Sequence, residues 1–177
     1  MMMRMLEAGG VDPLVDGFRE ADDDNPRGYY EFERVKGLPG DREWLDGATG
    51  RSVKVISGLL EHLPSDRPYR VVFMRRAMPE ILASQRRMLE RRGRPTDPSS
   101  DAKMSTLFEK HIVAVEQTLA SRPEFEVLDV TYASVLADSG QEAVRIAAFL
   151  GDSFDLDTVA MAAAVDLALY RQRVSND

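Results

Sequence analysis

Short, continuous apolar runs are the feature of this sequence that most restricts its fold. Three of them are typical of buried strands, at 52–57 (SVKVIS), 69–74 (YRVVFM) and 125–132 (FEVLDVTY). The run at 69–74 is the clearest, because it is rich in β-branched and aromatic residues and a helical pattern follows it at once. Runs of this kind favour a parallel sheet that helices cover on both faces.

Helical patterns separate these runs. The segment 79–93 begins with a proline suited to a first helical turn and ends with a glycine. In 101–121 the apolar residues recur three and four positions apart, and 139–150 and 157–166 are two further helical segments. The alternation predicts an α/β fold of three layers, a mostly parallel sheet with helices on both faces. We expect residues 1–177 to form a single domain.

The composition excludes several kinds of site. The chain has no cysteine, so disulfides, thiolate zinc sites and cysteine nucleophiles are excluded, and its only histidines are His62 and His111. We therefore expect no metal cofactor. No apolar run approaches the length of a membrane span, and Arg4 and Glu7 interrupt the apolar start, so we expect a cytoplasmic protein without a secretory signal.

Charge is distributed unevenly along the chain. The net charge of -7 argues against general nucleic-acid binding. The window 69–95, however, holds eight arginines against two glutamates. Such a basic segment on an acidic protein indicates either a local anion site or a solvated, arginine-rich helix face, and composition does not decide between them.

Arg76 follows the strand predicted at 69–74, and Ser84 lies eight residues later in the next helix. Ligands of open parallel sheets bind beyond the carboxyl ends of the strands, where helix N-termini favour anions. An arginine there can hold a phosphate by paired hydrogen bonds, and a serine hydroxyl can donate another. The alternative is an Arg76 that caps a helix or forms a salt bridge, with Ser84 as a small packing residue.

Residues 69–89 (YRVVFMRRAMPEILASQRRML) resemble the 3′-phosphate-binding segment of the sulfotransferases that use 3′-phosphoadenosine 5′-phosphosulfate (PAPS). Residues 125–151 are similar to a later strand and helix of that family, with Tyr132 and Leu136 in its pattern. The segment at 16–38 and the closing LYRQR resemble bacterial members. Ala77, Ala133 and Ser134 depart from the family pattern, because acidic residues are common at all three positions and an asparagine is also common at the first.

The resemblance implies a P-loop NTPase-like sulfotransferase fold and roles for particular residues. Arg76 and Ser84 would bind the 3′-phosphate of PAPS, and Arg171 and Arg173 would close over it, the alternative for that pair being a frayed polar tail. The acceptor would be a small molecule or a glycan. Glu31 would be the base that takes the acceptor's proton, the alternative being a surface glutamate on a helix. Lys54 and Ser57 stand on the segment where the family keeps a catalytic lysine and histidine, although Lys54 could equally face solvent. For His62 a structural or exposed position is preferred, and for His111 a surface or boundary one. Trp44, Tyr29 and Tyr30 would line an acceptor pocket or belong to the core.

One part of the family pattern is missing from the sequence. The family's first strand leads into a glycine- and serine-rich loop of the type P-R-S-G-T, which wraps the phosphosulfate with backbone N–H groups. No such loop occurs, and MMMRMLEAGG (1–10) resembles the helix that would follow it. We therefore expect an N-terminally incomplete sulfotransferase domain with impaired activity and possible self-association. The alternatives are a non-catalytic nucleotide-binding or assembly module and a nucleotide kinase, although the kinase motif G-x-x-x-x-G-K-[ST] is absent.

Overall fold

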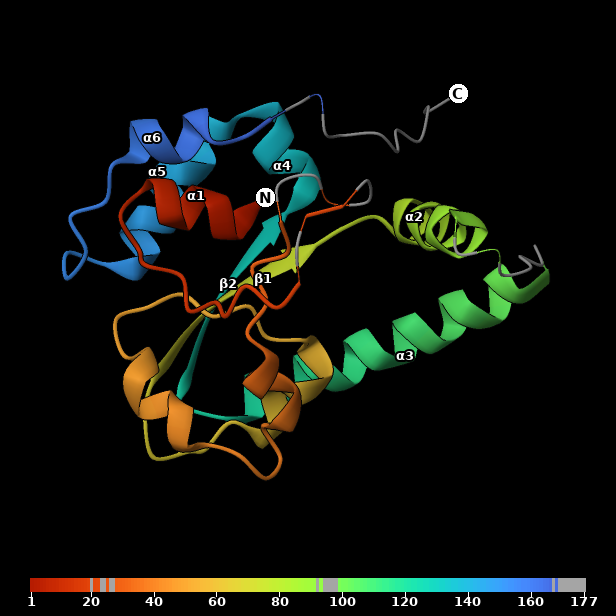
Figure 1. Cartoon of the computed structure of the whole chain (residues 1–177), viewed down its shortest axis with the longest axis horizontal. Coiled ribbons are helices and arrows are strands. Elements are labelled where there is room, and N and C mark those ends of the chain that lie inside the picture. Colours follow the sequence, from red (N-terminus) through yellow and green to blue (C-terminus); the bar gives the residue numbers. More distant parts are fainter. Residues whose placement is uncertain are drawn as a thin grey trace.

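The structure of the chain is a computed structural model, and it describes residues 1–19, 21–22, 25, 28–91, 93, 99–166 and 168 (Figure 1). Its elements are, in chain order, α1 (Met2–Ala8), the three-ten helices η1 (Glu33–Gly37), η2 (Glu43–Ala48) and η3 (Ser57–His62), β1 (Tyr69–Arg75), α2 (Met78–Arg91), α3 (Ser99–Ser121), β2 (Phe125–Thr131), α4 (Tyr132–Ala137), α5 (Ser139–Leu150) and α6 (Thr158–Ala163).

The two strands lie side by side and run parallel. Tyr69 is opposite Phe125, and Arg75 is opposite Thr131, so both strands end at the same edge of the sheet. The chain between them forms α2 and α3. The strands predicted from the apolar runs at 69–74 and 125–132 are confirmed, as is the α/β class.

The strand predicted at 52–57 is wrong. Only Ser52 makes a strand-like bridge, to Pro13, where the Leu14 N–H donates to the Ser52 carbonyl over 2.8 Å, and η3 begins at Ser57. Val53 and Val55 are nevertheless packed against the core. The apolar pattern at 52–57 therefore reflects side chains that pack against the core, and not the hydrogen bonds of a strand within a sheet. The described part of the sheet has two strands rather than three.

The sheet separates two hydrophobic cores. Because successive strand residues point to opposite faces, Val72 and Val130 face one core while Phe73 and Phe125 face the other. Side chains of α1, α4, α5 and α6 complete the first core, which lies above the sheet in Figure 1, and the three-ten helices with the C-terminal part of α3 complete the second. Helices thus cover both faces of the two-stranded sheet, as the sequence predicted for a larger one.

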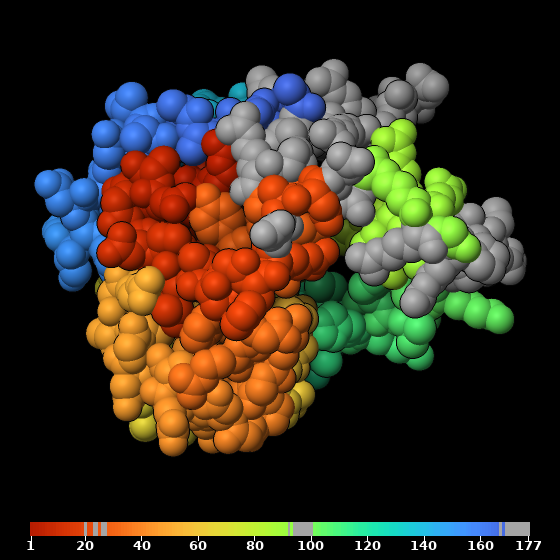
Figure 2. All heavy atoms as spheres, viewed as in Figure 1, coloured from red at the N-terminus to blue at the C-terminus, as the bar shows by residue number. Residues whose placement is uncertain are grey.

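The helices α2 and α3 form an arm that projects from the rest of the molecule (Figures 1 and 2). Val115 and Leu119, near the end of α3, belong to the second core, whereas Leu107 in its N-terminal half is 61% exposed. Arg86 Nη2 and Asp101 Oδ2, 3.0 Å apart, join the two helices. The helices predicted at 79–93 and 101–121 are confirmed with small shifts of their ends.

Side-chain caps explain where the C-terminal helices begin. Asp138 Oδ1 accepts a hydrogen bond from the Gln141 N–H before α5, and Asp157 Oδ1 accepts one from the Ala160 N–H before α6, both over 2.9 Å. Such caps satisfy N–H groups that have no partner within the helix. The helix predicted at 139–150 is confirmed, and the one predicted at 157–166 is shorter. Within the described ranges, no helix has the length and apolar character needed to cross a membrane.

Candidate functional site

Arg76 lies just beyond the carboxyl end of β1, and Tyr132 lies just beyond that of β2. Because Arg75 is opposite Thr131, the two residues that follow are neighbours, and the Arg76 guanidinium lies 4.8 Å from the centre of the Tyr132 ring. Arg76 Nε also donates a hydrogen bond of 2.8 Å to Glu80 Oε2, one turn into α2. The guanidinium is therefore held from one side by a carboxylate and along one face by a ring.

This position leaves part of the guanidinium available. The Arg76 side chain is 27% exposed, and among the described residues neither its Nη1 nor its Nη2 has a hydrogen-bond partner. Two parallel N–H groups on one edge of a guanidinium match two oxygens of a phosphate or carboxylate. Burial raises the pKa of the Tyr132 phenol, so its ring stays neutral beneath the guanidinium near neutral pH.

Ser84 lies further out on the same helix and is exposed. Glu80 and Ser84 are four residues apart, so they share a face of α2, and Glu80 is buried whereas Ser84 is exposed. Arg76 and Ser84 make no hydrogen bond to each other. The alternative drawn from the sequence, in which Arg76 forms a salt bridge, holds for its Nε, which is paired with Glu80.

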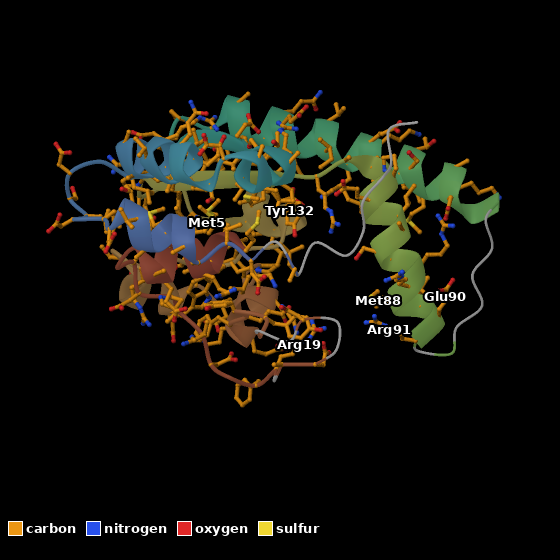
Figure 3. All side chains as sticks on the ribbon, turned by 90° about the horizontal axis from the view of Figure 1, so that it is seen from above. Met5, Arg19, Met88, Glu90, Arg91 and Tyr132 are labelled. Atoms are coloured by element: carbon orange, nitrogen blue, oxygen red, sulfur yellow. The ribbon has the colours of Figure 1, made fainter. Side chains whose placement is uncertain are left out.

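The two predicted catalytic residues lie together in a second cluster. Lys54 Nζ is 3.3 Å from Glu31 Oε1, and Arg19 Nη1 is 3.1 Å from the same oxygen. Lys54 also donates to the Tyr29 carbonyl over 2.9 Å, and the Arg19 guanidinium lies 3.3 Å from the centre of the Tyr29 ring. The same Glu31 oxygen is thus paired with two basic side chains. In Figure 3 the labelled Arg19 and Tyr132 lie on the side of the body from which α2 projects.

Tyr30 gives the segment before Glu31 an unusual backbone. Its φ of 52° is in the left-handed region, which residues other than glycine seldom adopt. Its hydroxyl donates to the Glu7 carboxylate at the end of α1, and burial together with this bond raises the pKa of Tyr30 to about 12. The strained residue thereby ties the Glu31 segment to α1, an arrangement found often at functional sites.

The aromatic residue Trp44 belongs to the core. It is buried, packs edge-on against Phe32 with the ring centres 5.4 Å apart, and donates its indole N–H to the Asp41 carbonyl. His62 is half-buried beside Glu61 at 3.8 Å. His111 is also half-buried, and its Nε2 lies 2.8 Å from Ser57 Oγ, a contact that no spacing in the sequence indicates.

The remaining predicted residues and the surface hollows add little. Arg171 and Arg173 lie outside the described residues. A shallow hollow of about 230 Å³ is lined by Ala83, Arg86, Arg87 and Glu90 on α2, and neither Arg76 nor Glu31 lines it. Within the described part of the chain, no three acidic or histidine side chains are grouped as metal ligands.

Sequence reasoning missed Glu80, Arg19 and the position of Tyr132 against Arg76. The Arg76–Glu80 pair has the four-residue spacing of helical ion pairs, so that spacing is a signal that could have found it.

Comparisons with family models, with curated proteins and with solved structures give no match. The resemblance to sulfotransferases therefore stays a prediction.

Proposed function

We propose that this chain is a sulfotransferase-like protein, and that its reaction is the transfer of a sulfuryl group from PAPS to a hydroxyl or amine acceptor. The observation that carries the proposal is Arg76, at the carboxyl end of β1, with Nε held by Glu80 and both Nη groups without a partner in the described chain. This edge is suited to the 3′-phosphate of the nucleotide, since a planar pair of donors binds two phosphate oxygens at once.

Sulfuryl transfer needs an acceptor in line with the donor, stabilisation of negative charge and a base. Glu31 is the proposed base, and Lys54, with its ammonium 3.3 Å from that carboxylate, would stabilise charge on the transferring group. PAPS would supply the sulfuryl group. No segment of the printed sequence has the composition of the family's phosphosulfate loop, so the roles proposed here concern the 3′-phosphate and the acceptor only.

Calorimetric titration tests the nucleotide site. The chain is titrated with 3′-phosphoadenosine 5′-phosphate and, separately, with adenosine 5′-monophosphate, which lacks the 3′-phosphate. We expect Arg76→Ala to weaken binding of the bisphosphate by about tenfold or more and to leave the monophosphate unaffected, because it removes a charge-assisted pair of hydrogen bonds. Arg67→Ala is the matched control, since Arg67 precedes β1 at the opposite end of the strand and pairs with Asp46 and Asp66.

Two results would overturn the assignment. If Arg76→Ala leaves binding of the bisphosphate unchanged, Arg76 is not part of the nucleotide site. If the monophosphate binds more tightly than the bisphosphate, the 3′-phosphate is not the group that the site recognises. A non-catalytic nucleotide-binding module would give the same titrations. It is distinguished by Glu31→Gln in a form of the protein that transfers sulfate, where loss of the base is expected to lower the rate about a hundredfold to ten-thousandfold without changing nucleotide affinity.

A further inference from the structure

We propose that Glu80 is the positioning residue of an oxyanion site whose contact residue is Arg76. In this assignment the Glu80 carboxylate binds Nε and turns the two Nη groups outward, toward the ligand. The inference rests on the proposed function for the identity of the ligand, a phosphate monoester, but the arrangement itself is a property of the described residues.

The Glu80 carboxylate is almost fully buried. Glu80 is 9% exposed as a residue and 12% exposed in its side chain. A carboxylate in such a place is costly unless it is paired and hydrogen-bonded, because it has lost most of its hydration. The Arg76 guanidinium, 2.8 Å away, provides the pairing. A surface salt bridge would not hold the arginine to one geometry, whereas a buried carboxylate does.

A second buried acid shows what a purely structural pair looks like in this chain. Glu142 on α5 is 8% exposed and accepts from Arg145 Nη1 over 3.0 Å. Arg145 Nη2 then donates to the Asp129 carbonyl over 2.7 Å, so the fold itself uses that side chain on both of its terminal amino groups. Arg76 differs, since among the described residues only its Nε has a hydrogen-bond partner.

Other arginines near the sheet follow the structural pattern. Arg75, the residue before Arg76, donates from Nε to Asp129 and from Nη1 to Glu116. Arg122 donates from Nε to Glu124 and from both Nη groups to backbone carbonyls of η3 and Leu63. A partly buried guanidinium whose outer edge is unused by the described chain, at the carboxyl edge of a parallel sheet, is the arrangement expected of a ligand contact.

The Tyr132 ring completes the geometry. The carboxylate fixes the Nε side of the Arg76 guanidinium and the ring, 4.8 Å away, covers one of its faces. The direction in which an anion can approach along two hydrogen bonds is then the outer edge. Fixing that edge before the ligand arrives lowers the side-chain entropy that binding would otherwise cost. Glu80 therefore acts through Arg76 and need not touch the ligand.

Two substitutions separate positioning from charge. Glu80→Gln keeps an acceptor for Arg76 Nε and removes the negative charge, whereas Glu80→Leu removes both. If Glu80 positions Arg76, the preference for 3′-phosphoadenosine 5′-phosphate over adenosine 5′-monophosphate falls about tenfold in Glu80→Leu and is rescued in Glu80→Gln. Glu142→Leu and Glu142→Gln are the matched controls, and they are expected to leave the preference unchanged while altering stability.

The experiment is read by titration and by NMR of the Arg76 side chain, with the full chain and inorganic phosphate as a second probe. In the unsubstituted chain and in Glu80→Gln, we expect slow exchange of the Arg76 Nε–H with water and shifts of its Nη signals on adding either anion. In Glu80→Leu, the exchange protection is lost and the shifts weaken. Amide spectra of each variant report whether it is folded, and Glu80→Ala, which also removes the acceptor for Arg76 Nε, replaces Glu80→Leu if that variant does not fold.

The outcomes distinguish the inference from the proposed function. If inorganic phosphate shifts the Arg76 signals in a Glu80-dependent way but the bisphosphate shows no preference, the nucleotide site fails and the positioning role of Glu80 stands. If neither anion shifts the Arg76 signals, or if both shift them equally in Glu80→Leu, the positioning role is wrong. Tighter anion binding in both Glu80 variants would show that the carboxylate only competes with the ligand, which also overturns it.

Discussion

Lys54 Nζ lies 3.3 Å from Glu31 Oε1, although 23 residues separate them in the chain. Arg19 Nη1 is paired with the same carboxylate oxygen, at 3.1 Å. The Glu31 side chain is 24% exposed and each cation is 41% exposed, so the cluster is at the surface with its acid innermost. Substituting Glu31 would leave both cations without their shared partner, whereas substituting Lys54 would leave Glu31 still paired with Arg19.

A double-mutant cycle with Glu31→Gln and Lys54→Met measures the pair. We expect a coupling free energy below about 1 kcal/mol, falling as salt is added, because both side chains reach solvent and Arg19 still binds Glu31 when Lys54 is gone. The measurement is the free energy of unfolding in urea for the four proteins. A salt-independent coupling above about 2 kcal/mol would mean that the pair is a buried structural unit rather than an accessible cluster.

The sequence allowed much of the fold to be predicted and less of the site. The strands β1 and β2 follow from apolar runs, and α2, α3 and α5 follow from helical spacing, because these patterns are local. The segment 52–57 misled because Val53 and Val55 are apolar for the sake of the core, while a ladder depends on a neighbouring strand that no local pattern specifies.

The site shows the same limit. The position of Arg76 follows from the end of a strand, and Glu80 is visible in a helical spacing of four. The meeting of Glu31 with Lys54 depends on the path of the loop before Glu31, where Tyr30 has a φ of 52°. The loop path is a tertiary outcome, since nothing in the residue type of a tyrosine favours the left-handed region.

The hydrogen bond between Ser57 Oγ and His111 Nε2 is expected to stabilise the packing of η3 on α3. Ser57→Ala leaves a half-buried imidazole nitrogen without its partner, so we expect a loss of about 1 kcal/mol in the free energy of unfolding. Ser105→Ala on the same helix is the control, because the Ser105 hydroxyl bonds to Glu109 at the surface and its removal should cost less than about 0.5 kcal/mol. Equal losses in urea denaturation, or strict additivity of Ser57→Ala with His111→Phe, would show that the contact is not coupled.

The raised pKa of Tyr30 leads us to expect a loss of stability at alkaline pH. Burial, followed by the hydrogen bond to Glu7, raises the pKa of its phenol from 10.0 to about 12. Between these values the unfolded chain releases the proton while the folded chain keeps it, so the stabilisation is complete below pH 10 and is lost as the pH rises toward about 12. Tyr30→Phe should flatten this part of the pH profile of the urea midpoint. Glu7→Gln should lower the pKa of Tyr30, seen in phenolate absorbance, and an unchanged absorbance titration in that variant would contradict the assigned contact.

The close approach of Gly9 to Met161 gives a test of how α1 packs against α6. An added Cβ would lie 2.5 Å from Met161 Cγ and 2.8 Å from its Sδ, and Met161 is fully buried in the first core, so the side chain or the helix would have to shift within a packed environment. The backbone is not the reason, because Gly9 has an ordinary φ of -78°. We therefore expect Gly9→Ala to lower the free energy of unfolding by about 1–3 kcal/mol through overpacking. Gly40→Ala is the control, since nothing lies within 4 Å of an added Cβ there. If the two variants unfold at the same urea concentration, α1 does not pack on α6 in this way; if Gly9→Ala is rescued by Met161→Ala, the two residues are in contact.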